Sequence, residues 1–334
     1  MSRSATFTFN DPIPYQAAIW GAEVEVLISV KGNFNAELTK IDFGRVWMSH
    51  VEENLPTLFR INPNANRAAV IFLANANQPN IQHSGMDVPS DAIIVCGPGE
   101  PRHMRTPGAC RWASMSLTPD DFLATGCMLA GHELTTGPVA RLVHPRPAHM
   151  KRLVGLHAAT RHLAEAAPDI LEHCEVSRAL EHELVCAMVA CVDDDVEPKA
   201  GSGWCHHTAI IKRFEEVLEA NCARPMYLAE ICAAVGTSQR TLQVCCEEHL
   251  GMSPIRYLWL RRMHLARRVL LEADPAHTTV TQIATDHGFW ELGRFAVSYK
   301  GLFGESPSAS LHRPSGDCRA GQHRPSGFAD SQFA

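Results

Sequence analysis

Short apolar runs separated by turn-forming residues dominate the first 145 residues of the chain. Residues 25–30, 68–73 and 92–96 are such runs, rich in Val, Ile and Leu, and Gly, Pro and Asn lie between them. Runs of this length with this punctuation are typical of β-strands. Many short strands in one region predict a barrel or jelly roll, so we expect residues 1–145 to form a β-rich domain.

The next region has a helical period. Apolar residues recur every three or four positions over residues 150–157 and again over 180–189, and Pro168 lies between the two stretches. We therefore expect a helical hairpin over residues 146–192. It would either cover the barrel or pair with a second subunit. The acidic and glycine-rich residues 193–207 predict a flexible linker.

Two stretches near the C-terminus repeat one pattern of apolar, glycine and proline positions. Residues 231–254 begin with Ile, carry Gly in the middle and end on Gly and Pro, and residues 283–307 repeat this with one extra residue. The middle glycine allows a tight turn between two helices, and Ser before Pro signals a new helix start. The repeat predicts two helix-turn-helix units, at about residues 228–250 and 280–303, and such pairs bind DNA.

One continuous helix should join the two units. Residues 254–271 are rich in Arg, Leu and Met, and beyond Pro254 they contain neither glycine nor proline. At 1.5 Å per residue this helix is about 27 Å long. A helix of that length would hold two recognition helices roughly one DNA turn apart.

The second helix of each unit has one apolar face, which should pack inward. In the first unit that face consists of Leu242, Cys245, Cys246 and His249, and in the second it consists of Phe295, Tyr299 and Phe303. Adjacent side chains on a helix diverge by about 100°. We therefore expect Cys245 and Cys246 to have a packing role rather than to form a disulfide.

Several motifs of the C-terminal region occur in an order known from one family. They are Ser238-Gln239-Arg240-Thr241-Leu242-Gln243, His249-Leu250-Gly251-Met252-Ser253-Pro254, Leu265-Ala266-Arg267-Arg268-Val269-Leu270, Gly288-Phe289 with Arg294-Phe295, and Phe303-Gly304-Glu305-Ser306-Pro307. Through these motifs, residues 208–312 resemble the DNA-binding domain of AraC/XylS-type transcriptional regulators. The resemblance implies two helix-turn-helix units in the major groove and a separate N-terminal domain, often a cupin-type β-barrel, that senses a small molecule or mediates dimerisation. The expected fold class is α+β, with a cupin-like jelly roll and helical hairpin followed by an all-α double helix-turn-helix domain.

Outward-facing side chains of the two recognition helices are the candidates for base contact. They are Gln239, Arg240, Gln243 and Val244 in the first unit and Gly293, Arg294 and Val297 in the second. Arg bonds guanine bidentately and Gln bonds adenine, which favours Arg240, Gln243 and Arg294. The candidates for phosphate contact are Thr241, Arg256, Arg262 and Lys300. For any one of these side chains, a solvated helix face is the alternative interpretation.

Charge gives the C-terminal region a weak electrostatic signal for DNA binding. Residues 205–313 contain 12 Lys and Arg against 11 Asp and Glu, a net charge of +1, whereas residues 1–204 contain 16 against 23, a net charge of −7. Val244 and Val297 also stand where the family commonly has Arg. We therefore expect low non-specific affinity for DNA, so that dimerisation or a ligand is needed for tight binding.

Composition predicts a cytoplasmic protein of 334 residues with two folded cores. The sequence shows neither a run of about 18 apolar residues nor a basic segment followed by an apolar one, so we expect no membrane span and no secretion signal. Its twelve cysteines include no C-x-x-C pair, which fits a reducing compartment. Residues 313–334 repeat His-Arg-Pro-Ser-Gly among small polar residues and predict a disordered tail.

Catalytic chemistry has little support in the sequence. A cupin enzyme requires a metal site, usually a close His-x-His pair with a carboxylate, yet His83 and His103 stand twenty residues apart and no His-x-His occurs. We therefore expect no catalytic residue, metal or cofactor. Trp20, Trp47 and Trp112 are candidates to line an effector pocket, although packing is the favoured role for each.

These observations predict a sequence-specific transcription regulator that responds to a small molecule bound in its N-terminal domain. Its expected partners are double-stranded promoter DNA, an unidentified small-molecule effector, RNA polymerase if the protein is an activator, and a second copy of the chain in a homodimer. One alternative is a cupin-type enzyme or binding domain fused to a DNA-binding module in which only the second unit reads bases.

Overall fold

Two antiparallel sheets form the N-terminal part of the chain. The computed structural model describes residues 3–64, 66–137, 139–194, 202–221, 226–313 and 321–322. Within these ranges one sheet has eight strands in the order β12-β9-β6-β11-β4-β3-β1-β13, and the other has five in the order β2-β5-β10-β7-β8. The strands are β1 (Arg3–Phe9), β2 (Ala22–Ile28), β3 (Ala36–Asp42), β4 (Trp47–Glu53), β5 (Thr57–Pro63), β6 (Ala68–Leu73), β7 (Ile81–His83), β8 (Met86–Val88), β9 (Ile93–Cys96), β10 (Arg102–Thr106), β11 (Cys110–Leu117), β12 (Arg141–Val143) and β13 (Gly321–Gln322).

The two sheets pack face to face over an apolar core, which defines a sandwich. Successive side chains of a strand point to opposite faces, so Val51 and Glu53 of β4 point between the sheets while Met48 points outward. Val51 accordingly packs with Phe59 of β5 and Trp112 of β11 in the inner core, where the rings of Phe59 and Trp112 meet edge to face at 5.8 Å. The expected mixed α+β class is confirmed.

Two helices interrupt the β-rich region, and the apolar pattern did not predict either of them. Helix α1 (Pro12–Ala18) follows β1, and the Asp11 side chain caps it by accepting a hydrogen bond from the Ile13 N–H at 2.9 Å. Helix α2 (Pro119–Leu129) is capped in the same way by Thr118. Each starts with a capping side chain followed by proline, a helix-start signal that is present in the sequence.

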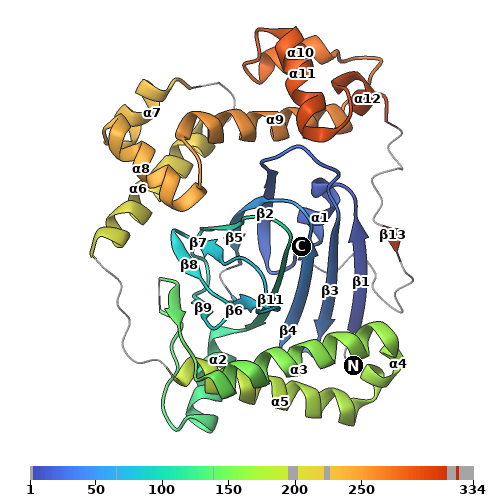
Figure 1. Cartoon of the computed structure of the whole chain (residues 1–334), viewed down its shortest axis with the longest axis vertical. Coiled ribbons are helices and arrows are strands. Elements are labelled where there is room, and N and C mark those ends of the chain that lie inside the picture. The colour runs from blue at the N-terminus through green and yellow to red at the C-terminus, as the bar shows by residue number, and fades with distance from the viewer. Residues whose placement is uncertain are drawn as a thin grey trace.

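A helical hairpin covers the outer face of the eight-stranded sheet (Figure 1). It consists of α3 (Pro147–Ala166), the short α4 (Pro168–Glu172) and α5 (Cys174–Asp193). His157 of α3 lies fully inside this contact, 3.2 Å from the Ser49 carbonyl oxygen and edge-on to the Phe72 ring. Covering the sandwich is therefore one use of the hairpin, and its pairing with a second subunit stays a prediction.

The C-terminal part is helical. Its elements are α6 (Ser202–Ala220), α7 (Leu228–Val235), α8 (Gln239–Leu250), α9 (Pro254–Glu272), α10 (Val280–Asp286), α11 (Leu292–Phe303) and α12 (Pro307–Leu311). Gly236 and Gly251 adopt left-handed backbone conformations with φ of 73° and 69°, which side chains other than glycine resist. Ser238 and Ser253 cap α8 and α9 by accepting backbone N–H bonds at 3.1 and 3.2 Å.

The C-terminal helices pack against the sandwich rather than standing apart from it (Figure 1). Leu27 of β2 and Leu58 of β5 point out of the five-stranded sheet and share one apolar core with α6, α8 and α9. Phe214 of α6 and Leu260 of α9 are fully buried in this core. The outer face of one sheet therefore positions the helix-turn-helix units.

Two expected boundaries are wrong. Residues 202–207, predicted as linker, form the first turns of α6, because His207 Nδ1 contacts Glu248 Oε2 of α8 at 2.5 Å and ties this helix down. The predicted tail also contains order, since Gly321 and Gln322 pair as β13 with β1 and Arg313 forms ion pairs. The remaining residues of both segments, 195–201, 314–320 and 323–334, lie outside the described residues.

Candidate nucleic-acid interface

The first recognition helix, α8, exposes part of the predicted base-contact face. Gln239 and Arg240 lie exposed at its N-terminal end, and Val244 is 39% exposed one turn further on. Gln243 is half-buried, and its Nε2 donates a hydrogen bond to Glu247 Oε1 on the same helix. Gln243 must therefore leave an internal partner before it can bond a base.

The inward face of α8 is the one that the sequence predicted. Leu242, Cys245, Cys246 and His249 are all at most 2% exposed. Burial raises the pKa of Cys245 to about 11 and raises the pKa of Cys246 further. Because the thiolate is the reactive form of cysteine, both side chains are inert packing groups. Burial, and then the neighbouring His103, lowers the pKa of His249 to about 4.

The second recognition helix, α11, has an aromatic inner face. Phe295 and Tyr299 pack with ring centroids 5.6 Å apart, and Tyr299 and Phe303 at 4.7 Å. The Tyr299 hydroxyl donates to Ser310 Oγ of α12 at 2.7 Å, so the buried phenol keeps a partner. This packing fixes the orientation of the outward face of α11.

The outward face of α11 is strongly exposed. Val297 is 75% exposed, Gly293 is exposed, and the Arg294 side chain is 79% exposed with its guanidinium 3.2 Å from Glu291. An exposed ion pair of this kind contributes little to stability. Arg294 is consequently free to exchange its carboxylate partner for a base edge.

Three of the four predicted phosphate contacts have internal partners. Arg256 donates to the Ser29 carbonyl oxygen of the sandwich at 3.2 Å and lies over the Trp259 ring. Arg262 lies over the Phe289 ring and donates to the Leu258 carbonyl oxygen. Thr241 Oγ1 is hydrogen-bonded to the Ser238 hydroxyl, whereas Lys300 is exposed.

Sequence reasoning missed an aromatic surface beside α11. Trp290 is 73% exposed in the turn of the second unit, and it borders a hollow of about 260 Å³ whose walls include Trp259, Phe289 and Arg294. The sequence contained a signal for this surface, because an indole in the turn directly after Gly288-Phe289 has no buried position to occupy. Stacking surfaces next to arginines are common where proteins meet nucleic acid.

A cluster of buried charges joins α6 and α9 to the sandwich. Glu215 of α6 accepts a hydrogen bond from the Tyr257 hydroxyl of α9 at 2.7 Å and lies 2.8 Å from Arg60 Nε of β5. Arg261 of α9 and His103 of β10 approach the same carboxylate at 3.5 and 3.2 Å. Burial alone would raise the pKa of Glu215, but these three cationic or imidazole groups lower it to about 2. The carboxylate is therefore ionised and holds both parts together.

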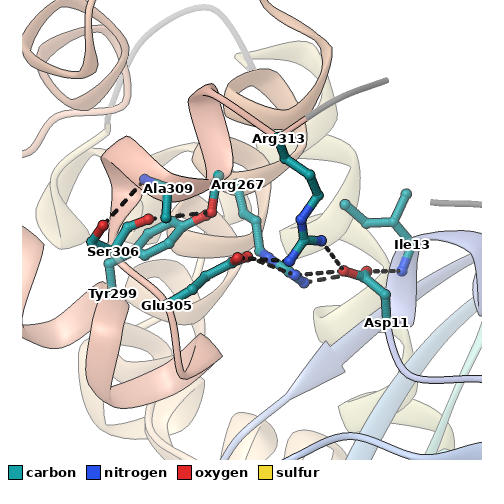
Figure 2. A network of polar contacts seen from close by, with 9 residues as sticks. Asp11, Ile13, Arg267, Tyr299, Glu305, Ser306, Ala309 and Arg313 are labelled. Carbon is teal, nitrogen blue, oxygen red and sulfur yellow. Dashed lines mark hydrogen bonds and ion pairs between the residues drawn. The ribbon is translucent and has the colours of Figure 1, made fainter. Parts of the chain in front are cut away.

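A second charged cluster joins α9 to the start of the sandwich, and we call it the Asp11 clamp (Figure 2). It consists of Asp11, Arg267, Glu305 and Arg313. Arg267 donates to both Asp11 oxygens at 3.2 and 2.5 Å, and each of these two side chains is only 6% exposed. Glu305 lies 3.2 Å from Arg267 and 2.6 Å from Arg313. Residues far apart in sequence therefore meet in one buried network that no sequence pattern indicates.

The sandwich residues considered as effector or metal candidates have packing partners. Trp20 and Trp47 stack on each other at 5.0 Å, and Trp112 lies in the inner core. His83 Nε2 lies 3.5 Å from Cys96 Sγ, and His103 is part of the Glu215 cluster. Among the described residues, no group of three or more His, Cys, Asp or Glu is placed to hold a metal ion. Every helix in the same ranges is too short or too polar to span a bilayer.

Comparisons with known proteins identify transcription regulators as relatives of this chain. A helix-turn-helix domain family matches residues 231–313. The chain is 28% identical over 247 residues to a protein of Rhodococcus erythropolis named "Probable thc operon regulatory protein", and the match covers 68% of this chain and 74% of that protein. It is 32% identical over 113 residues to the XylDLEGF operon transcriptional activator 2 of Pseudomonas putida, and this match covers 33% of this chain and 72% of that protein. A solved AraC family transcriptional regulator of Rhodopseudomonas palustris is 36% identical over 31% of this chain and 98% of its own, with a TM-score of 0.28.

Two helix-turn-helix units with exposed recognition faces on one connecting helix define a DNA-binding transcription regulator. The chain belongs to the AraC/XylS family of such regulators. Its relatives are regulators rather than enzymes.

Proposed function

We propose that this regulator reads its operator with both recognition helices and that a small molecule bound by the sandwich controls it. The observation that carries the proposal is the exposure of Arg240 on α8 and Arg294 on α11, two helices joined by one rod of 19 residues. Such a rod is about 28 Å long, close to one turn of DNA. The proposed base contacts are Gln239, Arg240, Gln243, Val244, Gly293, Arg294 and Val297.

Each type of side chain has a distinct role in this reading. Arginine donates to guanine O6 and N7, glutamine pairs with adenine, and valine contacts the thymine methyl group. Thr241, Arg256, Arg262 and Lys300 would contact phosphates and set the register. Arg256 and Arg262 would have to exchange the internal partners described above for phosphate oxygens.

The proposed division of the chain follows its cores. Residues 1–145 form a cupin-like sensor, 146–192 a hairpin that also offers a dimerisation surface, and 202–313 the DNA-binding domain. The relative named as an operon activator supports activation through RNA polymerase. We place this activity in the cytoplasm, together with the promoter DNA.

Control would act through the docking of the two parts. The Glu215 cluster and the Asp11 clamp fix how the helix-turn-helix units sit on the sandwich. A ligand changes DNA affinity only if it binds the docked and the released arrangements with different affinity. The sandwich is therefore both the scaffold of the reader and its sensor.

The proposed base recognition is tested by selecting bound duplexes from a random DNA pool at about 50 mM and about 200 mM salt. We expect a site with two blocks about ten base pairs apart. Because residues 205–313 carry a net charge of only +1, retention of unselected duplexes should be weak even at the lower salt. Recovery of unrelated sequences at both salts would contradict sequence-specific reading.

A second candidate is a regulator in which only α11 reads bases. The observation that favours it is that Gln243 is engaged by Glu247 and that α8 packs against the sandwich, where His249 lies against Gly85. Selection would then return a single block. The base preferences of single Arg240 and Arg294 variants separate the two candidates.

A further inference from the structure

One indole of the second unit is held in water by a well-packed turn. Trp290 lies between α10 and α11 and is 73% exposed. Its neighbour Phe289 points the other way, and the Phe289 ring packs on Phe295 with centroids 4.9 Å apart. The Phe289 N–H also donates to the Ala284 carbonyl oxygen at 2.9 Å. Because these contacts fix the turn, the exposed indole is a preformed surface, which indicates a partner that covers it.

The hollow beside Trp290 combines aromatic walls with positive charge. It has a volume of about 260 Å³, and Trp259 and Arg262 of α9 also line it. These two residues are three positions apart and therefore share one face of that helix. The start of α11 adds Arg294 and Glu291 to the lining. Two guanidinium groups and two indoles thus meet beside the N-terminal end of the second recognition helix.

Arg262 is the charged member of this lining that lacks a counter-charge. It is half-buried, and its contacts are the Leu258 carbonyl oxygen at 3.3 Å and the Phe289 ring. No carboxylate in the described ranges pairs with it, and burial alone lowers its pKa. The carboxylate of the lining, Glu291, is already 3.2 Å from Arg294. The hollow therefore has a net positive charge and suits an anionic partner.

A DNA strand is the partner that fits this combination. The N-terminal residues of a recognition helix lie closest to the base edges, so a strand whose bases meet Arg294 passes beside the turn that carries Trp290. The backbone of that strand alternates a charged phosphate with a deoxyribose whose carbon face is apolar. A guanidinium next to an indole matches this alternation. A free small molecule would have to hold itself in an open hollow, whereas α11 already brings a strand to this place.

We propose that Trp290 is a further DNA-contact residue, whose indole packs on one deoxyribose of the strand read by α11 while Arg262 binds the phosphate next to that sugar. The inference rests on the base reading by α11 proposed above and adds a contact beside it. Sugar and phosphate are the same at every position, so this contact supplies affinity and register rather than base preference. It offsets the weak electrostatic attraction of residues 205–313, whose net charge is only +1.

Anisotropy titration of the full chain with the duplex recovered by selection measures what Trp290 contributes. Trp290→Ala should weaken binding about tenfold, or about 1.4 kcal/mol, which corresponds to burial of roughly 60 Å² of apolar surface. Trp290→Phe should recover part of this loss, because a smaller ring still covers the sugar. Met128→Ala is the matched control, since Met128 is also 73% exposed but lies on α2 of the sandwich. This control should bind DNA as the native chain does.

The salt dependence of binding separates the sugar contact from the phosphate contact. Loss of the indole removes no phosphate contact, so Trp290→Ala should keep the slope of log affinity against log salt that the native chain has. Arg262→Gln should lower this slope by about one. A slope that falls as far in Trp290→Ala as in Arg262→Gln would show that the indole acts only by positioning Arg262, and would overturn the sugar contact.

Duplexes that each lack a single nucleoside locate the contacted sugar. A gap at that sugar, beside the block read by α11, should weaken binding of the native chain about as much as Trp290→Ala does. The same gap should have no further effect on the Trp290→Ala variant, because the two changes remove one contact. Gaps elsewhere in the site should weaken the native chain and the variant equally.

Unchanged affinity of Trp290→Ala, or equal effects of every gap on the native chain and the variant, would overturn the proposal. The thermal unfolding midpoint of Trp290→Ala should equal that of the native chain, because the side chain is exposed. A lowered midpoint would make the indole a structural residue and would also overturn the proposal. Selection with the native chain separates this proposal from the proposed function. A recovered site that is bound independently of Trp290 rejects this contact alone, whereas recovery of no site rejects the proposed reading as well.

Discussion

The two helix-turn-helix units repeat one sequence pattern but are held in different ways. The first has two cysteines at the centre of its inner face and packs against the sandwich through Leu27, Leu58 and His249. The second has an aromatic inner face built from Phe295 and Tyr299. It is joined to the sandwich mainly through α9 and the Asp11 clamp. Similar local signals therefore produce two units with different sources of stability.

This difference indicates that the two units depend on the rest of the protein to different extents. A unit with an aromatic core keeps its shape alone, and its recognition face stays open, as the 75% exposure of Val297 shows. A unit with small core side chains depends on its neighbours, and α8 depends on α6, α9 and the sandwich.

The largest expected effect is loss of the aromatic core of the second unit. Phe295→Ala should cost about 3–5 kcal/mol, because it removes a buried ring and leaves a cavity. Cys246→Ala, the matched change in the first unit, removes a single buried atom and should cost about 1 kcal/mol. Urea unfolding followed by circular dichroism measures both. Equal losses would show that the two cores do not differ as described.

Breaking the Asp11 clamp comes next. Arg267→Met leaves Asp11 buried with fewer partners and should cost about 3 kcal/mol, while Arg268→Met, next to it on α9, should cost less than about 1 kcal/mol. Hydrogen exchange should show that α10 to α12 lose protection before α7 and α8. Simultaneous loss in both units would contradict a clamp that serves the second.

Acid should weaken the docking of the first unit. Burial lowers the pKa of His249 to about 4 from an ordinary value of 6.5, so below pH 6.5 the unfolded chain binds a proton that the folded chain does not. The unfolding free energy should therefore fall as the pH drops from 6.5 towards 4, by about 1.4 kcal/mol per unit for this group. The difference in unfolding free energy between the native chain and the His249→Gln variant should shrink at that rate. A gap that is constant with pH would mean that His249 is not held neutral.

Breaking the exposed ion pair of Arg294 and Glu291 should have the smallest effect on stability and DNA binding. Glu291→Gln should leave stability within about 0.5 kcal/mol, because both side chains are more than 70% exposed. It should tighten DNA binding slightly, since Arg294 no longer has a competing carboxylate. Anisotropy titration of the selected duplex at two salts measures the change, and weaker binding would show that Glu291 itself contacts the DNA.

Local features of the fold were predictable from the sequence, and the contacts between its parts were not. Gly236 and Gly251 take the left-handed backbone that their positions indicate, and Ser238 caps α8 as its place before the helix predicts. These signals depend on neighbours within one or two turns of chain. The sequence identified Arg267 only as part of a motif and not as part of an ion pair, because its partner Asp11 lies 256 residues away.

The same distinction between local features and packing contacts applies to the candidate site. The buried face of α8 was predicted from helical spacing and is confirmed by Leu242 and His249. The hydrogen bond from Gln243 to Glu247 was not foreseen, although the spacing of four residues permits it. Nothing in the sequence singles out Glu53, and only the packing of the two sheets shows that it is buried.

The most direct measurement compares Arg240→Ala and Arg294→Ala by repeating duplex selection with each variant. If both units read bases, each substitution should cost about 1–3 kcal/mol and flatten the preference in a different block of the site. The two blocks should lie about ten base pairs apart, matching the length of α9. If only Arg294→Ala alters the preference and Arg240→Ala leaves the recovered site unchanged, the account of two reading units is contradicted.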